Sequence, residues 1–157
     1  MRIGLISDTH GLLRPGIADL FNGVSLILHA GDVGGAPILT ELATIAPVEA
    51  VYGNVDDPHD PMLARERSLS VEGVAIHVSH GHELGSPTAE SMLARYASSG
   101  ADVVVFGHTH KAVVVRLGGR LAINPGAAGP RRFELKPSVG LLTIDGGRAD
   151  AEIIWLA

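Results

Sequence analysis

Residue types that commonly bind metal ions recur at short spacing in this 157-residue chain. They stand in five segments: Asp8-Thr9-His10, Gly31-Asp32, Gly53-Asn54-Val55-Asp56, His80-Gly81-His82 and Gly107-His108-Thr109-His110. Imidazole, carboxylate and amide oxygen ligands suit Mn²⁺, Fe, Zn²⁺ or Co²⁺. These segments hold too many candidate ligands for one ion, but they suit two ions that share a carboxylate. The sequence therefore predicts a dinuclear metal site.

Each of these segments follows a short apolar run that is typical of a strand. The predicted strands are Arg2–Ser7, Leu26–His29, Val48–Tyr52, Val74–Ser79, Asp102–Phe106, Ala112–Leu117, Arg120–Ile123, Val139–Ile144 and Ala149–Trp155. Because the carboxyl ends of parallel strands converge on one edge of an open α/β sheet, we expect the five segments to meet there. The i, i+2 spacing would also place Asp8 beside His10, and His108 beside His110, on one side of an extended backbone.

Helical spacing separates some of these strands. It marks a segment at Ile17–Phe21, a second at Ile38–Ile45, and a third that Thr88 opens with Glu90 behind it. The first half therefore alternates strand and helix, whereas everything after Gly107 reads as a β-meander. No linker or repeat interrupts the chain, so we expect one domain over residues 1–157.

The composition excludes several classes of function. The 12 Lys and Arg against 17 Asp and Glu leave a formal charge of −5, so we expect no nucleic-acid partner and only a local anion site. The absence of Cys excludes disulfides, thiolate metal ligands and cysteine nucleophiles. The apolar runs are too short to span a bilayer and the first residues do not read as a signal peptide. We therefore expect a cytoplasmic protein without membrane association.

Each motif alone also has a purely structural interpretation. Gly-Asn-x-Asp is typical of a turn, because Asn and Gly tolerate left-handed backbone angles. An isolated Asp-x-His or Gly-Asp occurs in many proteins without a metal. The ordered set of motifs, each at a predicted strand end, favours the metal site over a series of turns.

In this order, and with Asn124-Pro125-Gly126-Ala127 after them, the segments resemble the calcineurin-like metallophosphoesterase superfamily, and within it the YfcE-like phosphodiesterases. The resemblance implies an α/β fold in a four-layer sandwich, two facing mixed β-sheets flanked by helices. It implies that one ion is held by Asp8, His10, Asp32 and His110. It implies that the second ion is held by Asp32, Asn54, His80 and His108, which would also be the catalytic residues. Asp32 would bridge two divalent ions, with manganese expected and iron, zinc, cobalt or nickel as alternatives.

Such a site favours the hydrolysis of a phosphoester. Two divalent ions outweigh the charge of two carboxylates and a hydroxide, so the site would attract a phosphate anion. A hydroxide bridging the ions would attack the phosphorus atom of a small substrate. We expect a phosphodiesterase, with a phosphomonoesterase on the same site or a non-catalytic protein-binding scaffold as alternatives. A homo-oligomer is compatible with the resemblance.

Several residues around the motifs have two interpretations. Val55 stands where many relatives have a His that protonates the leaving group, so His82 or His59 would have to replace it. Arg131 and Arg132 would bind the substrate phosphate if their loop folds over the site, and form a solvated pair otherwise. His82 is a further candidate for substrate binding.

Other residues near the motifs are assigned to the structure. His29 is expected to be buried beside the site, and Asp56 either orients a ligand or completes its turn. Trp155 and Phe133 are expected in the core, because the chain has few aromatic residues to fill it.

Overall fold

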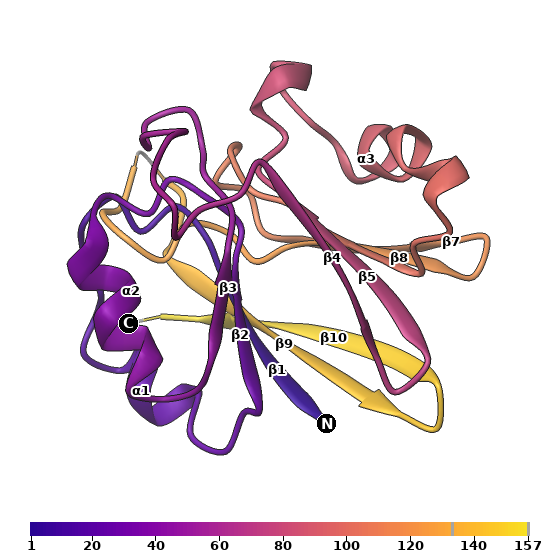
Figure 1. Ribbon diagram of the computed structural model, residues 1–157, viewed down its shortest axis with the longest axis horizontal. Helices are drawn as coiled ribbons and strands as arrows, with labels where there is room; N and C mark the ends of the chain where they lie inside the picture. Colours follow the sequence, from indigo (N-terminus) through magenta and orange to yellow (C-terminus); the bar gives the residue numbers. More distant parts are fainter. Residues whose placement is uncertain (133, 157) are drawn as a thin grey trace.

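Two five-stranded sheets form the centre of the molecule (Figure 1). The computed structural model describes residues 1–132 and 134–156. One sheet has the order β10-β9-β1-β2-β3 and the other β4-β5-β6-β8-β7. The strands of the first sheet are β1 (Arg2–Ile6), β2 (Leu26–His29), β3 (Val48–Ala50), β9 (Ser138–Asp145) and β10 (Arg148–Trp155). Those of the second are β4 (Glu66–Val71), β5 (Val74–Ser79), β6 (Val103–Val105), β7 (Val113–Leu117) and β8 (Arg120–Asn124).

Both sheets are mixed. In the first, β1, β2 and β3 are parallel, and β9 and β10 add antiparallel strands beside β1. In the second, β5, β6 and β8 are parallel, and the edge strands β4 and β7 are antiparallel to their neighbours. Parallel strands end at the same edge of a sheet, so each sheet presents several carboxyl-terminal loops on one side.

Alternation of side chains along the strands explains why the sheets face one another. Ile3 and Leu5 of β1 belong to the same buried apolar cluster as Val103 and Val105 of β6. Successive side chains of a strand point to opposite faces, so the residues between these must be covered from the other side.

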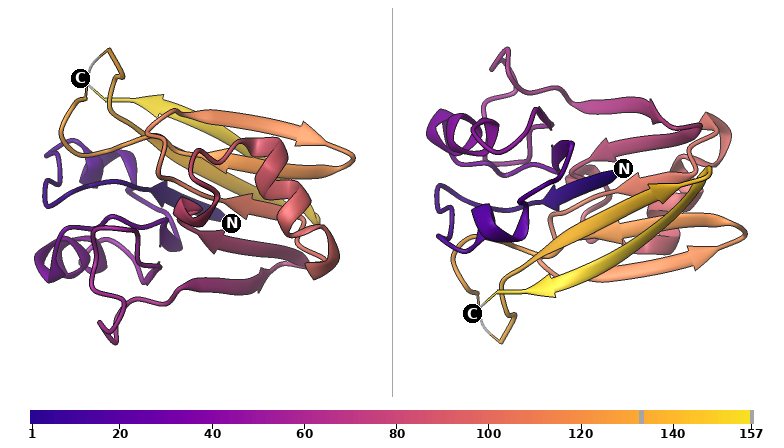
Figure 2. Two further views of the ribbon diagram at one scale, coloured as in Figure 1. Left: turned by 90° about the horizontal axis from the view of Figure 1, so that it is seen from above. Right: turned by 90° about the horizontal axis from the view of Figure 1, so that it is seen from below.

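The helices cover those outer faces. Ile27 of β2 packs in one cluster with Phe21, which follows α1 (Ile17–Leu20), and with Leu42 of α2 (Ala36–Ala43). Val104 of β6 packs with Met92 of α3 (Ala89–Arg95). The layers are therefore α1 and α2, first sheet, second sheet and α3 (Figures 1 and 2). The expected α/β sandwich of two facing mixed sheets is confirmed.

Two parts of the expected organisation are wrong. The strand β4 has no counterpart among the predicted strands, because its sequence, Glu66 to Val71, is mostly polar and lies at a sheet edge. The expected β-meander after Gly107 is in fact two hairpins in different sheets, since β7 and β8 belong to the second sheet and β9 and β10 to the first. The segment between Asn124 and Ser138 connects the two sheets.

That connection is fixed by hydrogen bonds at its ends. The Ser138 hydroxyl donates to the Pro125 carbonyl at 2.7 Å, and the Ser138 amide donates to the Ala127 carbonyl at 3.0 Å.

None of the helices in the described part of the chain has the length and apolar character needed to cross a membrane.

The amino terminus of α3 offers a test of its local stability. Thr88 accepts a hydrogen bond from the Ser91 amide at 3.1 Å, and the Ser91 hydroxyl accepts one from the Thr88 amide at 2.8 Å. Replacing Thr88 by Ala should lower the free energy of unfolding by about 1 kcal/mol, because the Ser91 amide would lose its partner. Urea denaturation measures the loss. Thr40→Ala, on an exposed position inside α2, is the control and should change stability by less than about 0.5 kcal/mol.

Candidate metal centre

Loops from both sheets meet at one end of the sandwich. The loops after β1, β2 and β3 come from the first sheet, and those after β5 and β6 come from the second. The expectation that a single sheet edge would gather all five is therefore wrong. The five loops meet because the two sheets pack face to face, which brings the carboxyl ends of their parallel strands together.

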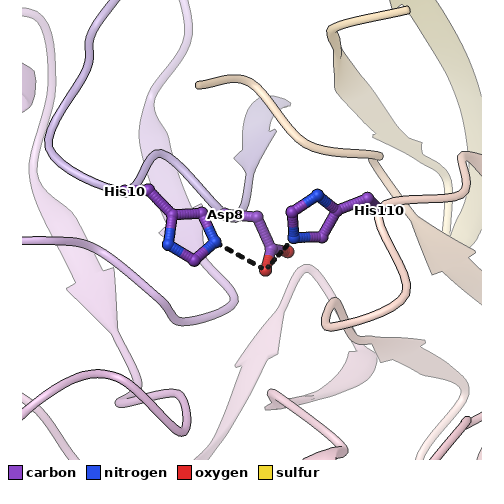
Figure 3. A group of neighbouring side chains, drawn as sticks. All are labelled: Asp8, His10 and His110. Carbon is purple, nitrogen blue, oxygen red and sulfur yellow. Dashed lines mark ion pairs between the residues drawn. The ribbon is translucent and has the colours of Figure 1, made fainter. Parts of the chain in front are cut away.

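Asp8, His10 and His110 form a first group of side chains (Figure 3). The Asp8 carboxylate is fully buried, and its Oδ1 lies 3.7 Å from His10 Nε2 and 3.3 Å from His110 Nε2. Its other oxygen accepts hydrogen bonds from the Ser7 hydroxyl at 2.6 Å and the His108 amide at 3.2 Å. One carboxylate oxygen is thus held by the protein while the other faces two imidazoles.

Asp32, His80 and His108 form a second group, with Asn54 beside it. Asp32 Oδ2 lies 3.3 Å from His80 Nε2. Asn54 Oδ1 lies 3.2 Å from His80 Nε2 and 3.1 Å from His108 Nδ1. The amide oxygen therefore faces the same point as the two imidazoles and adds no charge to it.

Asp32 lies between the two groups. Its Oδ1 accepts the Val55 amide hydrogen at 3.0 Å. Its Oδ2 is within 3.6 Å of His10 Nε2 in the first group and within 3.3 Å of His80 Nε2 in the second. The free oxygen of Asp32 lies closer to His80 than Asp8 Oδ1 does, at 3.3 Å against 3.9 Å, and an atom that both groups can reach can bridge two ions.

A backbone contact sets the orientation of His80. Its Nδ1 lies 2.7 Å from the Ala30 carbonyl, which can only accept a hydrogen. The proton on Nδ1 is therefore committed to Ala30, and Nε2 is the ring nitrogen that faces Asp32 and Asn54. This arrangement is typical of histidines that bind metal through Nε2.

The ligand loops have a strained backbone. Of the described non-glycine residues with positive φ, all but Glu72 lie in this centre: Asp8, His10, Asp32, His108 and His110. The left-handed conformation is unfavourable for L-residues by roughly 1–2 kcal/mol each, and such strain concentrates at functional sites. The extended backbone expected for Asp8 to His10 and for His108 to His110 is wrong. Tight turns bring these side chains together instead.

Two glycines permit the close approach of the loops. A Cβ added to Gly53 would lie 2.0 Å from Asp32 Oδ1, and one added to Gly107 would lie 2.2 Å from Ser7 Oγ. At Gly53 the space that a side chain would need is filled by a candidate ligand, and at Gly107 it is filled by the hydroxyl that holds one.

Unpaired buried atoms indicate that the centre fits metal ions. Among the described residues, the buried side-chain atoms without a hydrogen-bond partner are Asp8 Oδ1, His10 Nε2, His77 Nε2 and His82 Nδ1. Two of these four belong to the first group and a third lies on the ring beside His80. Buried polar atoms are rarely left unpaired, and oxygen and imidazole donors in two groups suit divalent transition metals.

The charges of the centre hold its carboxylates ionised. Burial disfavours the Asp8 anion, but the nearby imidazoles of His10 and His110 outweigh this effect and keep the pKa of Asp8 well below its usual range. Burial likewise opposes ionisation of Asp32, and the contact with His80 lowers its pKa. Burial disfavours a charged His80, but its contact with Asp32 and the charge of Asp8 raise its pKa. Both carboxylates are therefore available as anionic ligands near neutral pH.

Other residues singled out from the sequence lie around this centre. His82 is brought beside it, with its ring 5.4 Å from that of His80 and 6.3 Å from that of His108. Val55 is 57% exposed at the rim, next to Asn54. Arg131 and Arg132 are both exposed, and Arg131 lines a groove that also contains His110.

Two predicted supporting residues hold the loops. His29 is fully buried; its Nδ1 accepts the Gly31 amide hydrogen and its Nε2 lies 3.0 Å from Thr9 Oγ1. Asp56 accepts hydrogen bonds from the amides of Val33, Gly34 and Gly53, so it completes its own turn and ties it to the Asp32 loop.

The expectation that Trp155 lies in the core is wrong. The same expectation for Phe133 concerns a residue outside those that the structure describes. Trp155 is 57% exposed, because it stands near the end of the edge strand β10 and lines the same groove as His110. Sequence reasoning also missed Ser7, whose hydroxyl holds Asp8. The signal for Ser7 is a small polar residue at the end of an apolar strand, directly before a candidate ligand.

The fold and this centre define an α/β sandwich with a candidate divalent-metal site built by loops of both sheets. The chain belongs to the calcineurin-like phosphoesterase superfamily, whose domain matches residues 1–147. The recognition made from the sequence motifs is therefore confirmed, and the chain is a metallophosphoesterase by family.

Individual proteins agree with this assignment. A probable metallophosphoesterase of Methanothermobacter thermautotrophicus is 40% identical in a match that covers 98% of this chain and 92% of that protein. The phosphodiesterase YfcE of Escherichia coli is 28% identical, with 92% and 89% covered. The crystal structure of zinc-complexed Vps29 from Entamoeba histolytica has a TM-score of 0.82 at 23% identity, with 99% of both chains covered, and shows the same fold.

The close contact at Gly107 predicts a defect in metal binding. Gly107→Ala would place a methyl group 2.2 Å from Ser7 Oγ and 2.8 Å from Asp8 Oδ2, so Asp8 must move. We expect the free energy of unfolding to fall by about 1–3 kcal/mol, and the variant to retain less manganese than the wild type after both have been incubated with Mn²⁺. Urea denaturation and elemental analysis after dialysis measure these effects. Gly16→Ala is the control, since a Cβ there meets nothing within 4 Å. Equal metal content in the two variants would contradict the expected role of the loop.

The buried His29 predicts a dependence of stability on pH. Burial lowers the pKa of His29 to about 4. Between about pH 6.5 and 4 the unfolded chain therefore binds a proton that the folded protein does not, and acidification favours unfolding. We expect His29 to account for about 2 kcal/mol of the stability lost between about pH 7 and pH 4.5.

The pH dependence of stability is measured on chelator-treated protein, so that bound metal does not contribute to it. His29→Gln should lose less stability than the wild type over the same interval, as urea denaturation at both pH values would show. His59→Gln should behave as the wild type does, because the His59 side chain is 92% exposed. A His29→Gln protein with an unchanged pH dependence would refute the assignment.

Proposed function

We propose that this chain is a phosphodiesterase that uses two divalent metal ions, and that residues 1–157 act as one catalytic domain. The observation that carries the proposal is the position of Asp32, whose free oxygen lies within 3.6 Å of a histidine in each ligand group. The similarity to the phosphodiesterase YfcE supports the diester specificity.

One ion would be held by Asp8, His10, Asp32 and His110, and the other by Asp32, Asn54, His80 and His108. When bound, the two ions would supply positive charge for the phosphate oxygens and acidify a water molecule enough to make it a nucleophile near neutral pH. We propose manganese as the metal, with iron, zinc, cobalt and nickel as alternatives.

The side chains of the centre prepare it for this role. The lowered pKa of Asp8 and of Asp32 means that neither carboxylate has to release a proton when ions bind. His80, with its raised pKa, gives up a proton from Nε2 while Nδ1 keeps its hydrogen on the Ala30 carbonyl. Asn54 orients its oxygen without adding charge, so a net positive centre can form inside a chain of charge −5.

The rim favours esters with good leaving groups. Val55 has no group that could protonate a departing alkoxide, and His59 is far more exposed than the ligands, with 92% of its side chain accessible. His82 is beside the centre, and we propose that its ring donates a hydrogen bond to the bound phosphate. Aryl and other stabilised leaving groups need less protonation, so they should be hydrolysed fastest.

A scaffold that binds partner proteins is the second candidate, because Vps29 has the same fold. The seven candidate ligands are all present in this chain, and five of them keep a strained backbone that a purely structural loop would not need. The phosphomonoesterase alternative differs only in the charge of the substrate. A cytoplasmic location and self-association stay predictions from the sequence.

Replacing Asp32 tests the proposed activity. With bis(p-nitrophenyl) phosphate and added Mn²⁺, Asp32→Asn should lower kcat/KM by at least about 100-fold, because a metal bridge is lost. Elemental analysis should show less manganese on the same variant. Asp19→Asn, an exposed substitution on α1, is the matched control and should retain the wild-type rate. Equal rates for the two variants would show that the centre is not the catalyst, and the scaffold would then be favoured.

A further inference from the structure

A groove on the surface is lined in part by His110, a residue of the candidate metal centre. Its volume is about 560 Å³, which is within the range of small-molecule sites. His110 contributes to both places, since its Nε2 lies 3.3 Å from Asp8 Oδ1 and the residue also lines the groove. A phosphoester with its phosphorus at the centre would therefore extend one of its organic groups into this groove.

An exposed indole forms part of the groove wall. Trp155 is the only tryptophan of the chain and is 57% exposed, although most large apolar side chains of the described residues are buried. It lies on β10, while His110 and its neighbours follow β6, so residues far apart in the sequence build one wall. An accessible indole can stack on a planar ring of a ligand.

The groove is also positively charged. Lys111, Arg131 and Lys136 line it together with one acid, Glu134. The ion pairs found among the described residues include none of these three cations. In a chain of formal charge −5 this local excess of cations is unusual, and it lies outside the ligand groups that would bind the reacting phosphate.

From the indole and the cations together we infer that the groove binds the non-reacting arm of the substrate, and that this arm carries a planar aromatic ring and a second anionic group. A nucleoside with an additional phosphate has this chemistry. The inference rests on the proposed function and makes it more specific: the ring stacks on Trp155, and Arg131 and Lys136 pair with the second anion. The sequence proposes Arg131 and Arg132 together for substrate binding, but of the two only Arg131 lines the groove.

The single tryptophan allows a direct binding test in metal-free protein. Thymidine 3′,5′-bisphosphate should quench the fluorescence of Trp155 in a saturable way, whereas inorganic phosphate should not. The double variant Arg131→Ala, Lys136→Ala should weaken this binding about tenfold. Arg148→Ala is the control, since Arg148 is an exposed cation at the other end of β10. Absent quenching, or quenching that the double variant leaves unchanged, would overturn the inference.

A kinetic comparison tests the same groove during turnover with Mn²⁺. Thymidine 5′-p-nitrophenyl phosphate and ethyl p-nitrophenyl phosphate release the same leaving group and differ only in the other arm. The wild type should prefer the thymidine ester by about tenfold in kcat/KM, and Trp155→Ala should abolish the preference. Equal values for both esters in the wild type, or an unchanged preference in the variant, would contradict the inference. Failure to hydrolyse either ester would instead refute the proposed function. The fluorescence titration would then still show whether the groove binds the aromatic, anionic arm.

Discussion

The carboxylate of Asp32 is the contact on which the centre depends. The Val55 amide holds one of its oxygens, so the other faces His10 on one side and His80 on the other. His10 comes from a loop of the first sheet and His80 from a loop of the second. The two groups can therefore share one oxygen only when the sheets are packed face to face. The apolar core between the sheets thus sets the geometry of the polar site at their end.

That geometry requires the loops to approach more closely than side chains permit. Gly53 and Gly107 leave room for Asp32 and Asp8, and five candidate ligands adopt a left-handed backbone in the turns that follow their strands. Strained turns persist where the surroundings hold them, and here His29 and Asp56 supply hydrogen bonds to the loop amides. The buried histidine must remain neutral for this purpose, which links the stability of the loops to pH.

Most of the centre could be predicted from the sequence because its residues are local signals at strand ends. Asp8, His10, Asp32, Asn54, His80, His108 and His110 all stand within a few residues of an apolar run, and the structure brings them together. The pairing of strands into two sheets could not be predicted from these signals, because β7 to β8 and β9 to β10 are equally good hairpins and nothing local assigns each to its sheet. The mostly polar β4 was missed for a related reason: its partner β5 supplies its hydrogen bonds, so its own residues need little apolar character.

The environment of Trp155 also could not be predicted from local sequence signals. Its apolar character predicts burial, but its strand lies at the edge of the first sheet, where no further strand or helix covers it among the described residues. A hydrophobic side chain left exposed beside a polar centre loses the benefit of burial until a ligand covers it. The cations next to it would repel one another less when an anion lies between them. Both unfavourable features of the groove would be relieved by one ligand that combines an aromatic ring with negative charge, whereas an apolar or a purely anionic ligand would relieve only one of them.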